Sequence, residues 1–349
     1  MKSCFGKNIK VEIFGGSHEK FIGVTMKNFP VSSNDIDMEK LQIFLNKRAP
    51  GNDPLTSARK EADIAELYSD NPLTFRIKNT NIRPADYKNL AEIPRPGHAD
   101  YTAYMKYGGK VNMSGGGPFS ARMTAPLCIA GGIALQYLEK KGVAIHSHIL
   151  SIGKCFDDAF NPLNPATAKI DAEFPVLNPD AKYLMQENIK KAISQNDSLG
   201  GIIEVAVTGM PVGIGGAMYD GLESLLSPIY FGIPAVKGVE FGIGFKAAHI
   251  SGSQNNDAFE ISDGNIRTKT NNAGGILGGI SSGMPIIARL AFKPTPSISM
   301  QQDSVNLRTM RPCKLTIKGR HDPCVVPRAV PVVTAATALG MLDAMTESH

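Results

Sequence analysis

The sequence predicts an α+β fold in a single domain that spans residues 1–349. Segments of alternating apolar and polar residues, typical of half-buried strands, are interspersed with segments of helical apolar spacing. Hydrophobic residues make up 42% of the chain, enough for a sizeable core and too many for an unfolded protein. No internal repeat, low-complexity linker or break in composition divides the chain, so we expect one domain with several long loops.

The first 141 residues predict two strands and two helices. Alternation over 9–13 predicts a strand that ends in a polar loop, and a second strand follows over 22–26. Apolar residues near helical spacing predict a helix over 35–47. A longer helix is expected over about 120–141, with Pro126 in its first turn, where a missing N–H costs nothing.

The remaining 208 residues predict a mixture of strands and helices. Strands are expected near 143–151, 202–209, 236–241, 286–292 and 313–318, helices near 182–194 and 219–229, and a closing Ala-rich helix from about 328 to 345.

The charge balance favours a small anionic ligand over nucleic acid. Lys and Arg number 37 against 32 Asp and Glu, a net charge of +5, and no run of five or more basic residues occurs. The 35 Gly and 23 Pro residues exclude a long coiled coil.

Cysteine usage and hydropathy predict a cytoplasmic protein that does not enter a membrane. The five cysteines are odd in number and form no C-x-x-C pair, which favours reduced thiols over disulfides or zinc ligands. Residues 1–14 have no apolar core typical of a signal peptide, and the longest apolar stretch, 125–135, is too short to span a bilayer.

Two short motifs point weakly to other functions. Residues 279–283 match the G-x-S-x-G nucleophile elbow of hydrolases, but neither the preceding strand nor the following helix is expected there. His146 and His148 share a face of a predicted strand, and with no third ligand nearby a packed face is favoured over a metal site. Phosphate-binding P-loop and Rossmann motifs are absent from the sequence.

Four clusters of glycine and polar residues, at 14–18, 95–102, 114–122 and 319–324, place ionisable groups in loops where backbone can approach a ligand. Each has an ordinary local explanation: a surface histidine, a turn with a helix cap, a flexible loop with Ser120 as N-cap, and a solvated ion pair. The third cluster, at the start of the long predicted helix, is also a plausible phosphate cradle.

Together and in this order, the four clusters resemble those of chorismate synthases, and the resemblance runs from end to end. Further matches are Phe5-Gly6, Arg48 with Pro50-Gly51, Arg59 with Glu61 and Asp63, Lys106-Tyr107-Gly108, Thr124, and residues 235–240, 252–257, 272–283 and 293–295.

The resemblance implies a sandwich of central helices between antiparallel sheets, and usually a homotetramer. It implies a 1,4-anti elimination of phosphate from 5-enolpyruvylshikimate 3-phosphate, which gives chorismate for aromatic amino-acid biosynthesis. It also implies a requirement for reduced FMN without net redox change, with NADPH as a candidate reductant of the flavin. Neither a metal nor a nucleic-acid partner is implied.

Residue roles follow from positions in the matching motifs. His18 resembles the residue that protonates the departing phosphate, and His98 the one that protonates the reduced flavin. Asp322 with Ser17 resembles the pair that helps a flavin nitrogen take the substrate proton. The implied substrate-binding residues are Arg48, Arg122, Arg328 and, more weakly, Lys47. The implied flavin-binding residues are Arg48, Pro118, Phe119, Ser120, Ala235, Gly278, Lys293, Pro294, Thr295, Pro296, Ser297 and Arg320.

Five positions depart from the family pattern. The family's common Gly-Glu-Ser-His-Gly is changed by Gly16 and Glu19, Pro118 follows the three glycines, and Pro54 and Ala49 replace arginines. They leave an alternative open, an inactive paralogue that binds flavin or a phosphorylated ligand.

Overall fold

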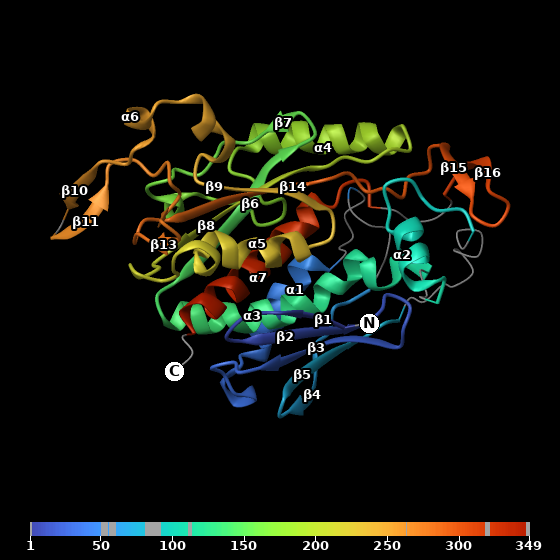
Figure 1. Cartoon of the computed structure of the whole chain (residues 1–349), viewed down its shortest axis with the longest axis horizontal. Coiled ribbons are helices and arrows are strands. Elements are labelled where there is room, and N and C mark those ends of the chain that lie inside the picture. Colours follow the sequence, from blue (N-terminus) through green and yellow to red (C-terminus); the bar gives the residue numbers. More distant parts are fainter. Residues whose placement is uncertain are drawn as a thin grey trace.

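Two five-stranded antiparallel sheets enclose a layer of helices in the computed structural model (Figure 1). The structure describes residues 2–49, 55, 61–80, 92–110, 114–262, 264–317 and 322–346. This arrangement confirms the predicted α+β sandwich.

The first sheet is built from the N-terminal 78 residues. Its strands, in spatial order, are β1 (Lys2–Phe5), β2 (Lys10–Gly15), β3 (Phe21–Lys27), β5 (Leu73–Lys78) and β4 (Glu66–Asp70). Val11, Val24 and Phe75 are buried because strand alternation turns them toward the helices. The strands expected over 9–13 and 22–26 are confirmed as β2 and β3, whereas β4 and β5 were not anticipated.

The second sheet comes from the C-terminal two thirds of the chain. Its strands, in spatial order, are β7 (Cys155–Phe156), β6 (Ala144–Ile152), β8 (Gly201–Thr208), β14 (Ile286–Phe292) and β9 (Val236–Phe241). The predicted strands near 143–151, 202–209, 236–241 and 286–292 are confirmed. Helix α4 (Pro179–Ser194) lies on the side of this sheet away from the central helices (Figure 1).

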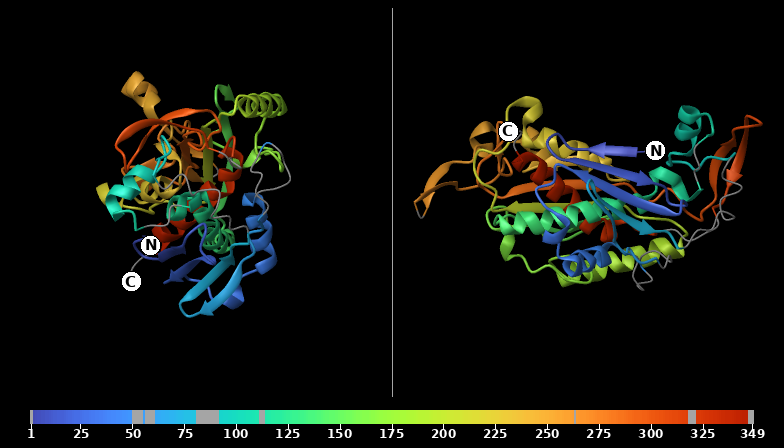
Figure 2. Two further views of the ribbon diagram at one scale, coloured as in Figure 1. Left: turned by 90° about the vertical axis from the view of Figure 1, so that its right-hand side faces the viewer. Right: turned by 90° about the horizontal axis from the view of Figure 1, so that it is seen from below.

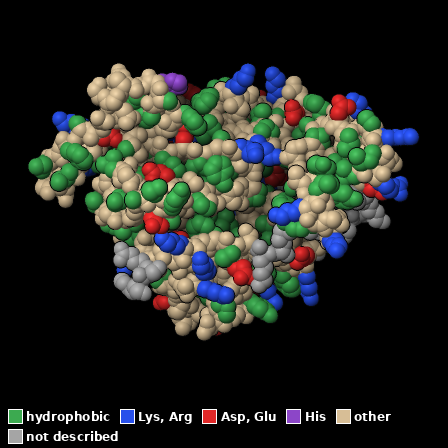
Figure 3. All heavy atoms as spheres, viewed as in Figure 1, with side chains coloured by type: hydrophobic (Ala, Val, Ile, Leu, Met, Phe, Trp, Pro, Cys, Tyr) green, Lys and Arg blue, Asp and Glu red, His purple; other side chains and the backbone are tan. Residues whose placement is uncertain are grey.

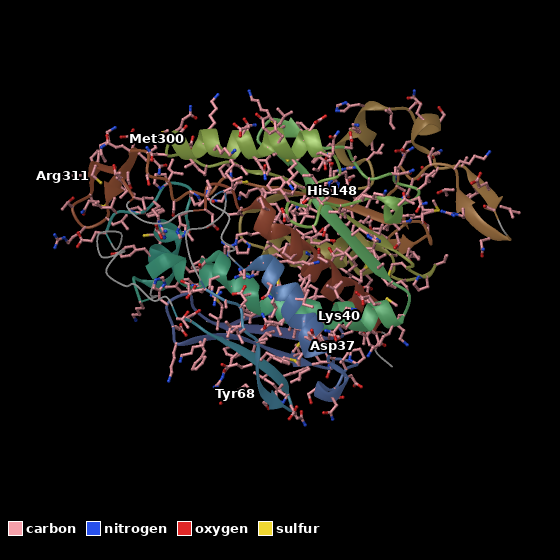
Figure 4. All side chains as sticks on the ribbon, turned by 180° about the vertical axis from the view of Figure 1, so that it is seen from behind. Asp37, Lys40, Tyr68, His148, Met300 and Arg311 are labelled. Atoms are coloured by element: carbon pink, nitrogen blue, oxygen red, sulfur yellow. The ribbon has the colours of Figure 1, made fainter. Side chains whose placement is uncertain are left out.

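A chain of charged side chains crosses the outer face of the second sheet. His148 pairs with Asp157 at 3.2 Å and with Glu204 at 3.0 Å, and Arg289 pairs with Glu204 at 2.8 Å. Figure 4 shows His148 on its strand inside the molecule. Both ring nitrogens of His148 are occupied by carboxylates, and no group of residues suited to a metal ion occurs in the described part of the chain.

The central layer consists of α1 (Met38–Arg48), α3 (Thr124–Lys140), α5 (Leu222–Gly232) and α7 (Val326–Met345). Pro126 lies in the first turn of α3, as expected. Helices α3 and α7 touch where Gly131 faces Ala335, so closely that a Cβ at Gly131 would lie 2.3 Å from the Cβ of Ala335. The two views of Figure 2 show these helices between the sheets.

Two polar contacts lie at the N-terminal end of α1. The Asp37 side chain caps its N-terminus by accepting a hydrogen bond from the backbone N–H of Lys40 at 2.9 Å. Lys40 forms an ion pair with Glu139 of α3. Both Asp37 and Lys40 are labelled in Figure 4, at the start of α1.

Short elements surround the sandwich. They are α2 (Asp100–Tyr107), α6 (Gly252–Asn255), β10 (Phe259–Ser262), β11 (Asn265–Thr268), β12 (Ile276–Leu277), β13 (Ile280–Ser281), β15 (Gln302–Asn306) and β16 (Arg311–Leu315). The strand expected at 313–318 is β16, which begins two residues and ends three residues earlier. The β10–β11 hairpin projects as an arm with hydrophobic side chains on its surface, among them Ile261 (Figure 3).

The sequence features outside the four clusters find structural explanations. Helix α7 has the length and apolar content of a membrane span, yet 78% of that window is buried inside the fold. Ser281, the serine of the elbow-like motif, is buried in β13, where its hydroxyl donates to the carbonyl of Pro211 and accepts from the N–H of Ile214. It is therefore not an exposed nucleophile. All five cysteines are free.

Candidate functional site

A cavity of about 340 Å³ opens where α3 and α7 begin and α1 ends. Five basic side chains line its described part, against the two carboxylates of Glu61 and Asp322. These basic residues are Arg48, Arg95, Arg122, Lys293 and Arg328. Asp63 and Asp100, behind the lining, offset part of this charge by pairing with Arg48, Arg122 and Arg95. The positive ends of the α3 and α7 dipoles add to the remaining excess, so the site favours an anion.

A buried carboxylate holds two of the arginines in place. Asp63 is fully buried, and its Oδ2 accepts a hydrogen bond from Arg48 Nε at 2.6 Å, while Arg122 Nη1 pairs with its Oδ1. Arg122 also receives support from Asn79 Oδ1, at 3.1 Å from its Nε. Fixed guanidinium groups of this kind bind carboxylates and phosphates with little loss of entropy.

Besides Arg48 Nη2, which Asp63 holds in an ion pair, two polar atoms of cavity-lining residues are buried without a hydrogen-bond partner among the described residues. They are Arg122 Nη2 and Thr295 Oγ1, and both residues line the cavity. A buried donor without a partner costs about 1–3 kcal/mol, so these atoms beside the cavity are places where a ligand or a water would supply the missing hydrogen bond.

The loop before α2 carries His98 to the cavity wall. Arg95 Nε and Nη2 hold the two oxygens of Asp100 at 2.6 and 2.7 Å, and His98 Nδ1 lies 2.7 Å from Asp100 Oδ1. Burial would raise the pKa of Asp100, but the hydrogen bonds from Arg95 and His98 outweigh it and hold that pKa well below its usual range. Asp100 is therefore ionised. The ordinary explanation of this cluster as a turn with a helix cap is not supported, because the N-cap position of α2 is Ala99 and no side chain of the described residues caps the helix there.

The segment after β14 forms the wall facing that loop. Ser297 Oγ accepts a hydrogen bond from Arg95 Nη1 at 3.1 Å, and Lys293 Nζ donates to the carbonyl of Gly97. Burial, followed by the charge of Lys237, lowers the pKa of Lys293. Residues 95–100 and 293–297, almost 200 positions apart, thus hold each other around the cavity.

Ser17 and His18 lie behind the glycine-rich loop and are not part of the cavity lining. Ser17 Oγ is 3.1 Å from His18 Nδ1, and the ring of His18 lies directly against Gly115, which does line the cavity. Gly115, Gly116 and Gly117 all have positive φ, so the loop can pass this close to the histidine.

Asp322 and Arg328 meet the cavity from the start of α7. Arg328 Nη1 donates to Asp322 Oδ2 at 2.8 Å, and its Nε donates to the backbone carbonyl of Arg48 at 3.2 Å. Burial lowers the pKa of Arg328, with the nearby Asp322 opposing this effect. Lys47, the neighbour of Arg48 on α1, is exposed and does not line the cavity.

The structure brings most of the expected flavin positions together. Arg48, Phe119, Ser120, Ala235, Lys293, Thr295, Pro296 and Ser297 line the cavity. Pro118 and Pro294 adjoin these residues without lining it. Arg320 lies outside the described residues, as do Pro54, Arg59 and the rest of 319–321.

Gly278 is not brought to this cavity. It lies in the β12–β13 turn, and the next residue, Gly279, packs against Gly221 at the start of α5. The cavity instead takes residues 233–235 from the other end of α5.

The glycine-rich loop does not open directly into α3. Ser120 caps a short 3-10 turn by accepting from the N–H of Arg122 at 3.3 Å, and α3 begins only at Thr124. The phosphate-cradle hypothesis therefore shifts from the glycines to the 3-10 turn and the Thr124 end of α3, which both line the cavity.

Two departures from the family pattern have a local explanation in the structure. A Cβ on Gly16 would lie 3.1 Å from Glu19 Oε1, so the Glu19 carboxylate occupies the space beside residue 16. Asn79 Nδ2 donates to the carbonyls of Gly16 and Glu19 and holds this turn.

Sequence reasoning missed several residues that shape the site. Glu61, Asp63 and Thr124 appeared only as matches to the family, and Arg95 and Asp100 only as neighbours of His98. The one available signal was the placement of acidic residues near arginines in Gly- and Pro-rich segments, which does not reveal which acid pairs with which arginine.

The fold and the cavity together define an enzyme for a small anionic substrate. The family model described as chorismate synthase matches residues 9–346. A relative named chorismate synthase from Lancefieldella parvula is 42% identical, over 99% of this chain and 96% of the relative. One from Korarchaeum cryptofilum is 40% identical, over 99% and 97%. A solved structure described as "Crystal Structure of Chorismate Synthase" has a TM-score of 0.74 at 24% identity, covering 97% of this chain and 92% of the other.

The chain therefore belongs to the chorismate synthase family. It is a carbon–oxygen lyase of aromatic amino-acid biosynthesis.

Proposed function

We propose that the chain eliminates phosphate from 5-enolpyruvylshikimate 3-phosphate at this cavity, by a 1,4-anti elimination that uses reduced FMN. The observation that carries the proposal is the set of five basic side chains around two unpartnered buried polar atoms, Arg122 Nη2 and Thr295 Oγ1. A substrate with one phosphate and two carboxylates supplies the oxygens that such groups need.

The arginines would bind and orient the substrate. Arg48 and Arg122 are held by Asp63 and Arg328 by Asp322, so their positions are set before the ligand arrives. Preorganised donors avoid an entropy cost on binding and align the leaving group. Lys47, which is exposed, is the weakest member of this set.

The cavity also suits a flavin. Apolar surfaces of Phe119, Ile233 and Pro296 can contact a ring system, while Ser120 and Thr295 offer hydroxyls for polar groups. The remaining proposed flavin positions are Arg48, Pro118, Ala235, Lys293, Pro294, Ser297 and Arg320, whereas Gly278, which the resemblance also implied, lies at the far end of α5 from this cavity. When bound, reduced FMN supplies electron density to the substrate and takes it back without net redox change.

Side chains of the chain itself would handle the protons. His18 would protonate the departing phosphate and His98 would deliver a proton to the reduced flavin, since imidazole exchanges protons near neutral pH. Asp322 and Ser17 would assist removal of the substrate proton. Asp322 lines the cavity, whereas His18 lies behind Gly115, whose backbone separates its ring from the cavity.

The wider context of the enzyme is also part of the proposal. We expect a cytoplasmic homotetramer without a nucleic-acid or membrane partner. One continuous hydrophobic cluster reaches both sheets and the central helices, which supports a single domain over residues 1–349. Whether NADPH reduces the bound flavin is tested by supplying oxidised FMN with NADPH as the only reductant.

The test is an anaerobic assay with reduced FMN, in which phosphate release and chorismate absorbance are followed together. His18→Ala and His98→Ala should each slow turnover by about 10²–10⁴-fold, the usual cost of losing a general acid. Unchanged rates in both variants would contradict the assigned roles. Tight flavin binding without any turnover in the wild type would favour the inactive paralogue instead.

A further inference from the structure

We propose that Asp100 is a positioning residue that holds His98 with its proton on Nδ1 and its Nε2 facing the cavity. The proposal rests on the proposed function of His98 in that cavity. It concerns the fixed pairing of three residues, Arg95, His98 and Asp100, on one short loop.

Both oxygens of Asp100 are fully engaged. Oδ2 accepts from the backbone N–H of Arg95 at 3.0 Å and from its Nε at 2.6 Å. Oδ1 accepts from Arg95 Nη2 at 2.7 Å and faces His98 Nδ1 at 2.7 Å. Because Asp100 is only 7% exposed, water does not compete for these contacts.

This geometry selects one tautomer of His98. An ionised carboxylate only accepts hydrogen bonds, so the 2.7 Å contact with Asp100 Oδ1 favours a proton on Nδ1. The opposite tautomer would place two lone pairs against each other at that distance. In the opposite tautomer Arg95 Nη2, 3.0 Å from Nδ1, would donate to that nitrogen, but its contact with Asp100 Oδ1 is shorter, at 2.7 Å.

The other ring nitrogen is turned toward the glycine-rich loop of the cavity. A Cβ on Gly116 would lie 3.4 Å from His98 Nε2, and His98 itself lines the cavity. With Nδ1 occupied, Nε2 is the only position at which His98 can gain or give up a proton. The pairing thus directs proton exchange into the cavity.

The carboxylate is itself anchored to the opposite wall. Arg95 Nη1 donates to Ser297 Oγ at 3.1 Å, so the chain of contacts runs from Ser297 through Arg95 and Asp100 to His98. A carboxylate that orients a histidine in this way affects both the ring angle and the tautomer.

The first test reads the tautomer directly and does not require turnover. In the full-length protein labelled with ¹⁵N-histidine, the resonances of His98 are identified by their absence from His98→Gln. We expect the nitrogen shift of a protonated Nδ1 in the wild type, and loss of this preference in Asp100→Asn. An Nδ1 without a proton in the wild type would overturn the proposal, whatever the outcome of the activity assay.

The second test separates positioning from a general structural role. Asp100→Asn should lower turnover by about 100-fold or more in the wild-type background. In the His98→Gln background the same change should have almost no further effect, because residues that act as one unit are not additive. Equal losses in both backgrounds would mean that Asp100 does not act through His98. Wild-type turnover in His98→Gln would instead refute the proposed function. The tautomer measurement would still decide whether Asp100 holds the proton of His98 on Nδ1.

Discussion

Substituting Gly115 by Ala should displace His18 and reduce activity. A Cβ at Gly115 would lie 2.1 Å from His18 Cε1, whereas ordinary contact begins at 3.4 Å, so the ring has to move by about 1.3 Å. Misplacing a catalytic group by about 1 Å costs on the order of 100-fold in rate. We therefore expect kcat/KM of Gly115→Ala to fall by about 100-fold in the anaerobic assay.

The backbone at Gly115 adds a separate effect on stability. Its φ is +60°, a region in which Ala costs about 1–2 kcal/mol, and the free energy of unfolding should fall by about that amount. Gly108→Ala is the matched control, because Gly108 has a φ of +58° and nothing within 4 Å of an added Cβ. The control should lose similar stability and keep its activity. If Gly115→Ala keeps the activity of the control, the placement of His18 beside the cavity is wrong.

Three further predictions concern stability, measured by urea unfolding. Gly131→Ala should lower the unfolding free energy by about 1–3 kcal/mol, because the added Cβ forces α3 away from α7. Gly232→Ala is the control and should have no such effect, because there is open space around Gly232. Equal effects of the two substitutions would contradict the close contact between the helices. Asp63→Asn should cost about 3–5 kcal/mol, because two buried arginines lose their charge partner, and a cost under 1 kcal/mol would refute that pairing. Burial lowers the pKa of His148, but hydrogen bonds to its two carboxylates outweigh burial and raise it. The contribution of His148 to the free energy of unfolding is therefore complete below the unfolded pKa of about 6.5 and is lost as the pH rises through the raised pKa of the folded state. The His148→Gln variant should lack this dependence of the unfolding free energy on pH.

Elements with strong periodicity could be predicted from the sequence. Helix α7 and strands β9 and β14 lie close to or at their expected positions, because their apolar residues face the core at a regular spacing. Strand β4 was missed because it is mostly exposed, so its sequence has no apolar face to recognise. Strand β5 does carry such a face, with Leu73, Phe75 and Ile77 in alternation, and this pattern was overlooked. Its position depends on pairing with β3, a contact made across about fifty residues.

The residues of the site likewise fall into those that the sequence identified and those that only the structure revealed. The family motifs pointed to His98, Arg122 and Asp322, and the structure places all three at one cavity. Sequence spacing did not reveal that Asp63 pairs with two arginines from different helices, because ion pairs between distant segments depend on tertiary packing. The same limitation applies to Gly278, whose turn packs at the far end of α5 from the cavity.

The activity proposed for the protein is the elimination of phosphate from 5-enolpyruvylshikimate 3-phosphate at this cavity. The most direct measurement is the yield of phosphate and chorismate under anaerobic conditions with reduced FMN, in the wild type and in Arg122→Gln, which removes one of the unpartnered donors. Equal amounts of both products are expected from the wild type, and kcat/KM should fall by a large factor in the variant. Phosphate release without chorismate, or a variant with wild-type kinetics, would contradict it.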